Sequence, residues 1–399
     1  MFAIALLANA LAAPITLDVD ASKARQYLLQ VEEHIPVSGR TAQLTLPKWI
    51  PGEHQPSGTI NHVFGFHAYV KGKEIPWRRD PIELFTINVD LPDGTDELQI
   101  KFKVASSPGD NLTAHLGRIK WNRLVFLPAG RIDSIPVKAS LTAPAGWVIQ
   151  SAMHGYPKGD RRDFETVSAE KLVDSPAQIG EFGKSFEVAS GYWFDVLVDD
   201  PKQLELRPEI LTAFKNLVVQ SQALTGAKHF KEYHWLSTFS SQGASEGLEH
   251  HECSEDGESP DALKPENGYT LGELMCHEMF HSWNGKYRRP AGLVTKTFTE
   301  PQQTELLWVY EGLTQYYGVV LACRAGFITP ETTRDHIADT IYNLITPGRK
   351  WRPLADTAVA ASILRSGSSW LDRRSQSYYN EGLAVWLEAD AIIRSKTRS

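Results

Sequence analysis

The amino-acid sequence predicts an α+β fold in which an antiparallel β-sandwich domain precedes a part made of a small β-sheet and helices. Three observations predict it. Short segments of alternating apolar and polar residues fill residues 15–170, and Pro-Gly and Pro-Asp-Gly turns separate them. From Thr270 onward, the apolar residues take helical spacing. The chain has 399 residues, 42% hydrophobic and 22% charged, which is enough for two or three domains with their own cores.

The β-rich part contains five expected strand segments. They are ITLDVD, YLLQVEEHIPV, AQLTLPKWI, ELQIKFKVA and KASLTAPAGWVIQSA. Short strands at regular spacing are typical of a sandwich. Two more strand segments, FEVASGYWFDVLVDD and HFKEYHWLSTFS, come next, with the amphipathic helix PEILTAFKNLVVQSQALTG between them. Residues 250–268 are polar, and we expect them to form a loop between the sheet and the helices.

The helical part begins with TLGELMCHEMFHSWNG. Thr270 and Glu273 have the spacing of a capping box, and Gly285 follows the last apolar residue, so a helix is expected between them. A second helix, TELLWVYEGLTQYYGVVLACRAG, should end at Gly326. A third begins with Thr329 as its N-cap, and SYYNEGLAVWLEADAIIRSK is the last.

Composition argues against several classes of protein. The net charge is −7 and no long basic run is present, so nucleic acid is not an expected partner. The three cysteines form no Cys-x-x-Cys pair, which argues against both a cysteine zinc cluster and a disulfide framework. No window of about 20 residues is apolar and free of charge, so no stable membrane insertion is expected.

The first residues resemble a secretory signal peptide. Residues 2–7 are apolar, and small residues follow with Ala-x-Ala spacing at positions 8–12. We therefore expect residues 1–13 to be a signal peptide and the protein to be periplasmic or secreted. Because no basic residue precedes the apolar run, the alternative is a buried first strand or short helix in a cytoplasmic protein.

A His-Glu-x-x-His motif indicates a zinc site. His277 and His281 lie one helical turn apart, so their imidazoles face the same way and can chelate one ion. Glu278 lies about 100° further around the helix axis, where its carboxylate can reach a water at the metal and act as a general base. The alternative is a surface helix with two solvated histidines.

The neighbouring residues argue against that alternative. Met275, Phe280 and Trp283 are apolar, so the helix is expected to be largely buried. Buried imidazoles need polar partners, and a metal ion meets this need.

The motif does not identify the third protein ligand of the zinc ion. No third histidine follows at the longer metallopeptidase spacing, so a carboxylate on another helix is expected. The candidates are Glu300, Glu305 and Glu311. Glu311 is favoured because it stands mid-helix among large apolar residues, where a carboxylate is costly to bury without a partner. Glu300 precedes a proline and is expected in a loop or at a helix entry.

The segments HEMFHSWNGKYRRP and LLWVYEGLTQYYG resemble the glycyl aminopeptidase family of zinc metallopeptidases, which are gluzincins related to thermolysin. Five further segments resemble parts of the same family: LPKWIPGEHQPSG, LVDSPAQIGEF, EGLEHHECS, TPGRKW and SYYNEG. The similarity extends from about residue 20 to 396. It implies a β domain in residues 14–170 and a thermolysin-like catalytic domain in residues 171–399.

The resemblance also implies roles for single residues. One zinc ion would be bound by His277, His281 and Glu311, with Glu278 as the general base. The substrate would be a peptide with a free N-terminus.

Two further roles follow from the resemblance. Glu249, with Gly247 two residues before it, would bind the free α-amino group of the peptide. Tyr379 would donate a hydrogen bond to the oxyanion of the tetrahedral intermediate. Tyr378 is adjacent, and spacing does not distinguish the two tyrosines.

The chain departs from the family pattern in three places. Glu381 stands where the family has lysine, residues 251–254 differ from the family's Arg-Asn-Ser, and the chain ends at Ser399 without the expected PDZ domain and part of the helical half. The expected function is an exported zinc aminopeptidase that removes N-terminal Gly or Ala from peptides. The alternatives are a zinc endopeptidase with the same site and a catalytically weak relative that binds peptides.

Overall fold

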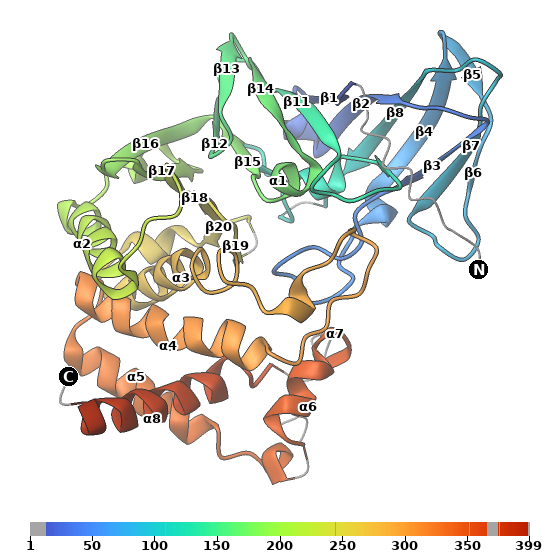
Figure 1. The fold of residues 1–399 in the computed structure, drawn as a ribbon. Coiled ribbons are helices and arrows are strands. Elements are labelled where there is room, and N and C mark those ends of the chain that lie inside the picture. The colour runs from blue at the N-terminus through green and yellow to red at the C-terminus, as the bar shows by residue number, and fades with distance from the viewer. Residues whose placement is uncertain are drawn as a thin grey trace.

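Strands fill the N-terminal half of the chain and helices fill most of the C-terminal half (Figure 1), so the predicted α+β class is confirmed. The structure is a computed structural model that describes residues 13–107, 109–243, 245–350, 352–364, 374 and 376–397. The proposed signal peptide lies outside these residues except for its last position. Within them, no helix is long and apolar enough to cross a membrane.

The largest sheet of the N-terminal part has eight strands. Their order across the sheet is β13 (Gly155–Lys158), β14 (Arg161–Ser168), β11 (Pro136–Thr142), β1 (Ile15–Asp20), β2 (Leu28–Pro36), β8 (Glu97–Ala105), β4 (Val63–Val70) and β5 (Lys73–Ile75). All neighbouring pairs are antiparallel except β1 and β11, which run parallel.

Two smaller sheets complete the N-terminal part. One contains β10 (Leu127–Pro128), β3 (Thr41–Thr45), β7 (Thr86–Asp90) and β6 (Trp77–Arg79), in that order. The other contains β12 (Val148–Ser151), β15 (Ala177–Gly180) and β9 (Leu116–Ile119), and the short helix α1 (Ala169–Val173) precedes β15. Because β15 pairs with β9 and β12, we propose that the N-terminal domain includes β15. Its boundary then lies later in the chain than residue 170, where the sequence analysis put it.

The alternation of apolar and polar residues along the strands drives the formation of these sheets. Along β8, Leu98, Ile100, Phe102 and Val104 are buried, and the residues between them are exposed or half-buried. Burying each such side chain contributes about 1.5–3 kcal/mol. Their common face packs into a core that also receives Leu44 and other side chains of the four-stranded sheet.

One predicted strand is shorter than expected. AQLTLPKWI forms β3 only as far as Thr45, because Pro47 has no N–H for a sheet and Pro51 begins a turn. Residues 46–58 instead form a loop that crosses to the C-terminal part. There the backbone N–H groups of Lys48 and Trp49 donate to the carbonyl of Phe298, at 3.1 and 2.8 Å. We call residues 46–58 the crossing loop.

A five-stranded sheet lies between the N-terminal sheets and the helices (Figure 1). Its order is β16 (Phe182–Ala189), β17 (Tyr192–Val198), β18 (Tyr233–Phe239), β20 (Cys253–Glu258) and β19 (Glu246–Glu249). β17, β18 and β20 are parallel, and α2 (Pro208–Thr225) connects β17 to β18. The other two pairs are antiparallel.

The predicted loop over residues 250–268 is wrong in part, because β20 lies inside it. This strand is buried although its sequence is Cys-Ser-Glu-Asp-Gly-Glu. Each of its two buried acidic side chains has a polar neighbour: His250 contacts Glu255, and Ser254 donates to Asp256. A strand of this kind lacks the apolar alternation by which strands are predicted.

The helix that carries the His-Glu-x-x-His motif, α3 (Gly268–His281), begins and ends earlier than expected. Its N-cap is Asn267, so the predicted capping box is wrong: Thr270 lies inside the helix, and Glu273 accepts a hydrogen bond from Gln315. The helix packs on the five-stranded sheet, where the indole N–H of Trp235 donates to the carbonyl of Met275 at 3.1 Å.

Of the remaining helices, α4 packs against α3, and the others pack against α4 or against one another. α4 (Leu307–Ala325) ends as predicted before Gly326, and α5 (Pro330–Asn343) begins as predicted after Thr329. α6 (Leu354–Val359), α7 (Ala361–Leu364) and α8 (Asn380–Thr397) follow. Glycines let these helices cross closely: a Cβ on Gly318 of α4 would lie 3.2 Å from the Cβ of His277, and one on Gly312 would lie 2.6 Å from the Cα of Gly382. The close crossing brings Glu311 next to α3.

Candidate active site

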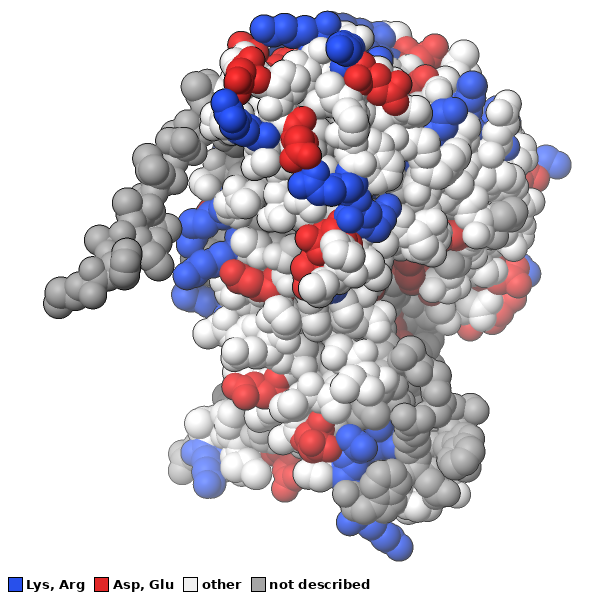
Figure 2. Space-filling model, turned by 90° about the vertical axis from the view of Figure 1, so that its right-hand side faces the viewer, with Lys and Arg blue, Asp and Glu red and all other residues white. Residues whose placement is uncertain are grey.

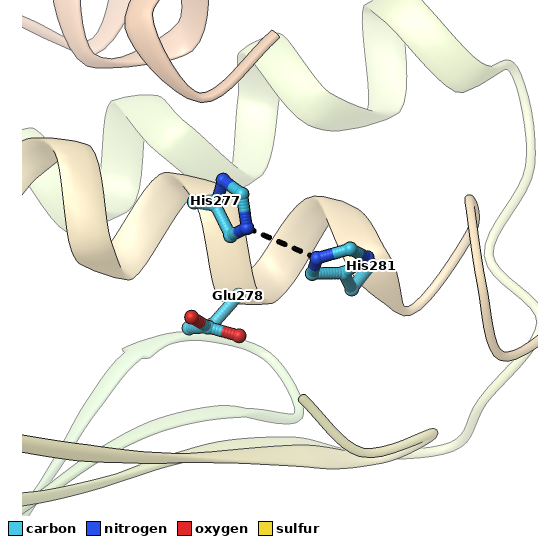
Figure 3. A group of neighbouring side chains, drawn as sticks. All are labelled: His277, Glu278 and His281. Carbon is cyan, nitrogen blue, oxygen red and sulfur yellow. Dashed lines mark hydrogen bonds between the residues drawn. The ribbon is translucent and has the colours of Figure 1, made fainter. Parts of the chain in front are cut away.

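His277 and His281 project from the same side of α3, and Glu278 leaves the helix in another direction (Figure 3). The Nε2 atoms of the two histidines are 3.0 Å apart. Both side chains are buried. The predicted one-turn geometry of the motif is therefore present in the structure.

Glu311 of α4 meets this pair. Its Oε2 atom lies 3.0 Å from Nε2 of His281 and 3.3 Å from Nε2 of His277, and the residue is 2% exposed. The two other candidate ligands are elsewhere. Glu305 is exposed, and Glu300 is exposed and accepts a hydrogen bond from the backbone N–H of Lys296.

The tautomer of His281 suits metal binding. Its Nδ1 atom lies 3.0 Å from the carbonyl of Asn284, which can only accept, so Nδ1 carries the proton. Nε2 is then a bare lone pair that faces the other two side chains. Thr314 does not change this assignment, because its hydroxyl donates to the carbonyl of Tyr310 at 2.7 Å.

The donor set fits a zinc ion. Two imidazole nitrogens and one carboxylate oxygen stand 3.0–3.3 Å from one another. Ligand atoms at zinc bond lengths and tetrahedral angles are separated by about 3.3 Å. A zinc ion held by two histidines and one carboxylate would keep one coordination position for water or substrate, as catalytic zinc sites do.

Glu278 faces the backbone of β19. A Cβ on Gly247 would lie 2.1 Å from Oε1 of Glu278, so only glycine allows this approach. Burial raises the pKa of Glu278 well above its ordinary value, and the carboxylates of Glu249 and Asp256 raise it further. Such an environment favours a carboxyl group that takes up a proton during a reaction.

Glu249 stands at the end of β19, enclosed by two other elements. The hydroxyl of Tyr310 donates to its Oε1 atom, and Gly52 of the crossing loop packs against it. Gly52 has a φ of +92°, and a Cβ there would lie 2.7 Å from Oε2 of Glu249. Burial raises the pKa of this carboxyl, but His281 and Lys286 outweigh burial and hold the pKa below its ordinary value.

The two adjacent tyrosines occupy different places. Tyr379 lines the same pocket as the residues above, and its ring centroid is 6.0 Å from that of His277. Tyr378 is fully buried in a cluster with Leu293 and Leu307. Of the two, only Tyr379 is positioned to reach a substrate.

Glu381, at the position where the resemblance implies a lysine, forms structural contacts. It forms ion pairs with Arg349 and Arg374 at the start of α8, two residues after Tyr379.

The pocket has a volume of about 120 Å³. Five carboxyl groups line it: Glu53, Glu246, Glu249, Glu278 and Glu311. Arg118 and Lys120 form ion pairs with Glu246, at 2.8 and 2.5 Å, and offset its charge. On the outer face shown in Figure 2, by contrast, acidic and basic side chains are interspersed. The pocket is therefore a small acidic site that favours a cationic group.

Two residues at the site were missed in the sequence. Tyr310 contacts Glu249, and His54 of the crossing loop contacts Oε1 of Glu311. Tyr310 precedes Glu311 but looked like an apolar neighbour in a helix. The Pro-Gly turn before His54 predicted a loop. The contact of His54 with Glu311 could not be predicted from a local sequence pattern, because the two residues are 257 positions apart.

A buried ionic network lies behind β19. Lys286 donates to Asp174 at 2.8 Å, and His250 contacts both Asp174 and Glu255, at 3.2 and 3.3 Å. Burial raises the pKa of Glu255, but Lys120 and His250 outweigh it and lower the pKa to about 2. The network joins the end of α1 in the N-terminal part to β20 and to the segment after α3, and its member His250 directly follows Glu249 in the chain.

Asp256, in the same strand, is the exception. Burial raises its pKa to about 8, and Glu255 adds to the increase although Ser254 donates a hydrogen bond. The folded protein therefore keeps this carboxyl neutral at pH values where the unfolded chain ionises it. Because the folded-state pKa is above the unfolded value, the protein loses stability as the pH rises from about 4 to about 8.

Asp256→Asn should remove this loss. The neutral amide resembles the neutral acid, so the free energies of unfolding of variant and wild type should be close at pH 4–5. At pH 8 the variant should be more stable, by roughly 5 kcal/mol, because a pKa difference of one unit corresponds to about 1.4 kcal/mol. Urea denaturation at the two pH values measures the difference, and an equal change at both pH values would contradict the raised pKa.

Comparison with known proteins reveals relatives of both parts of the chain. The sequence model of the peptidase M61 N-terminal domain matches residues 16–181, and that of the M61 glycyl aminopeptidase matches residues 270–385. No curated protein sequence matches the chain.

Solved structures share the fold. The crystal structure of an aminopeptidase N family protein from Idiomarina loihiensis has a TM-score of 0.83 and 21% sequence identity, covering 96% of this chain and 67% of that one. Yeast leukotriene A4 hydrolase in complex with bestatin has a TM-score of 0.55 and 12% identity, and 95% of this chain covers 58% of it. The native hydrolase from Saccharomyces cerevisiae has a TM-score of 0.56 and 11% identity, covering 95% of this chain and 59% of that one.

Proposed function

The chain belongs to the M61 glycyl aminopeptidase family, and on this premise we propose that it is a zinc-dependent aminopeptidase that removes N-terminal Gly or Ala from peptides. One observation carries the proposal: the His277, His281 and Glu311 donor atoms converge in a pocket that also contains the buried carboxylate of Glu249. Export from the cytoplasm, as the first residues predict, is part of the proposal.

His277, His281 and Glu311 would hold the zinc ion. When bound, zinc supplies a Lewis acid that polarises the scissile carbonyl and makes water more acidic. Glu278 takes the proton of the attacking water and delivers it to the leaving amine. The direction of its pKa shift supports this role, because a carboxylate with a raised pKa is a stronger base than an ordinary glutamate.

Two residues position the substrate. The phenol of Tyr379 donates a hydrogen bond to the oxyanion as the tetrahedral intermediate forms. The carboxylate of Glu249 accepts hydrogen bonds from the α-ammonium group of the peptide, and its lowered pKa keeps it charged for this contact. The pocket volume of about 120 Å³ supports a small first residue such as Gly or Ala.

Glu249→Gln tests the aminopeptidase function. Glutamine retains an acceptor for Tyr310 but loses the charge that pairs with the substrate amine, so KM for Gly- and Ala-arylamides should rise roughly 10- to 100-fold. The matched control is Glu252→Gln, three residues along, whose carboxylate pairs with Lys171 outside the pocket. It should leave KM unchanged.

The same assay separates the alternatives when N-acetylated substrates and a metal chelator are included. The wild type should cleave only substrates with a free amine, and the chelator should abolish cleavage. Equal cleavage of acetylated peptides would indicate an endopeptidase, and peptide binding without cleavage would indicate an inactive relative.

A further inference from the structure

The crossing loop carries one buried histidine into the active site. His54 is 1% exposed, and its Nε2 atom contacts Oε1 of Glu311. The loop is held at both ends: Trp49 donates its backbone N–H to Phe298, and the backbone N–H of Gly58 donates to the carbonyl of Lys48 at 3.1 Å. The N-terminal part of the chain thereby reaches a side chain of α4.

The two oxygens of the Glu311 carboxylate contact different residues. Oε2 faces the His277–His281 pair, and Oε1 faces His54. Because an ionised carboxylate can only accept, the Nε2–H group of His54 is the donor. The hydrogen bond fixes the rotation of the carboxylate, so that Oε2 remains directed at the two histidines.

The backbone of His54 supports a specific role for this side chain. Its φ is +54°, in the left-handed region that residues other than glycine rarely adopt. Such conformations cluster where a function fixes them. The ring also packs edge-on against Tyr310, with centroids 5.5 Å apart. Its Nδ1 atom has no hydrogen-bond partner among the described residues. Burying such a nitrogen costs free energy, and an apolar ring would fill the same space without that cost. Packing alone therefore does not account for a histidine here.

We propose that His54 is a positioning residue for the zinc-binding carboxylate of Glu311, which makes the N-terminal β domain part of the metal site. The inference rests on the proposed zinc-binding function. It is physically expected because groups that hydrogen-bond to metal ligands fix the orientation of the ligand and strengthen metal binding. Docking of the crossing loop then couples the integrity of the N-terminal domain to zinc affinity.

Two variants test the role of His54. His54→Asn keeps a residue that tolerates the left-handed backbone, but its shorter side chain does not reach Glu311. Competition with a zinc-specific chelator should show zinc binding weakened about 10- to 100-fold. His54→Gln restores an N–H donor on a longer side chain, and it should recover most of the affinity.

The matched control is His67→Asn. His67 lies in β4 of the same domain, and its Nδ1 atom contacts Glu74 at 2.8 Å, but this His–Glu pair is on the surface. Zinc affinity should not change. Thermal unfolding without zinc is measured for all three variants, so that loss of zinc binding is separated from loss of folding.

The outcomes decide between positioning and packing. Weakened zinc binding with an unchanged zinc-free melting temperature supports positioning. A lowered melting temperature with unchanged zinc affinity overturns it. If His54→Asn lowers both, His54→Gln decides: recovered affinity supports positioning, and a loss as large as that of asparagine overturns it. A wild type that binds no zinc overturns the proposed function as well, whereas a zinc-binding wild type with an unaffected His54→Asn overturns this inference alone.

Discussion

Glu278→Gln should lower kcat by roughly 10²–10⁴-fold, the contribution that a positioned general base makes to catalysis, while the protein retains its zinc. Glutamine has nearly the same shape as the glutamate it replaces, so it fits between α3 and Gly247, but it cannot take a proton. Because His277, His281 and Glu311 are unchanged, zinc content should equal that of the wild type. Steady-state kinetics on a Gly-arylamide and elemental analysis of the same sample measure both quantities.

The control for this variant is Glu273→Gln. Glu273 is on the same helix, accepts a hydrogen bond from Gln315 and does not line the pocket. Its kcat should remain within a few-fold of the wild type. If Glu278→Gln retained wild-type turnover, Glu278 would not be the base. If the Glu278→Gln variant also lost its zinc, the fall in kcat would result from the missing metal and not from the missing proton transfer.

Glu311→Gln should remove most of the zinc. The substitution replaces an anionic ligand with a neutral amide at a position that is 2% exposed. Loss of a residue that only orients a metal ligand costs up to about 100-fold in metal affinity, so loss of the ligand itself should cost at least that much. Turnover should fall with zinc occupancy and recover in part when excess zinc is supplied. Chelator competition and kinetics across a range of zinc concentrations measure these effects.

Two controls distinguish Glu311 from the other carboxylates that the sequence offered. Glu300→Gln and Glu305→Gln change exposed residues that do not line the pocket, so both should bind zinc as the wild type does. Wild-type zinc affinity in Glu311→Gln, or lost affinity in either control, would require a different third ligand.

The parts of the site that the sequence predicted are those whose geometry is local or whose burial is costly. The pairing of His277 and His281 follows from helical spacing alone. Glu311 was recognisable because it is the acidic residue in a stretch of apolar helix, where an unpaired carboxylate is unfavourable. In the same way, Gly326 and Thr329 identified one helix end and one helix start, since caps depend on residues within one turn.

The parts that the sequence did not predict depend on contacts far along the chain. β20 is buried with Glu255 and Asp256 inside it, and Lys120 of the N-terminal part helps to offset Glu255. The capping-box spacing of Thr270 was misleading, because Gln315 of another helix binds the expected capping glutamate. His54 reaches Glu311 across 257 positions, and only the packing of two domains brings them together.

The most direct test of the metal site is the zinc content of the purified, dialysed protein, measured by elemental analysis together with activity on a Gly-arylamide. The proposed function predicts one zinc ion per chain, loss of activity when a chelator removes it, and recovery when one equivalent of zinc is returned. A protein that cleaves the free-amine substrate at full rate with no bound metal would contradict the convergence of His277, His281 and Glu311 on a catalytic ion.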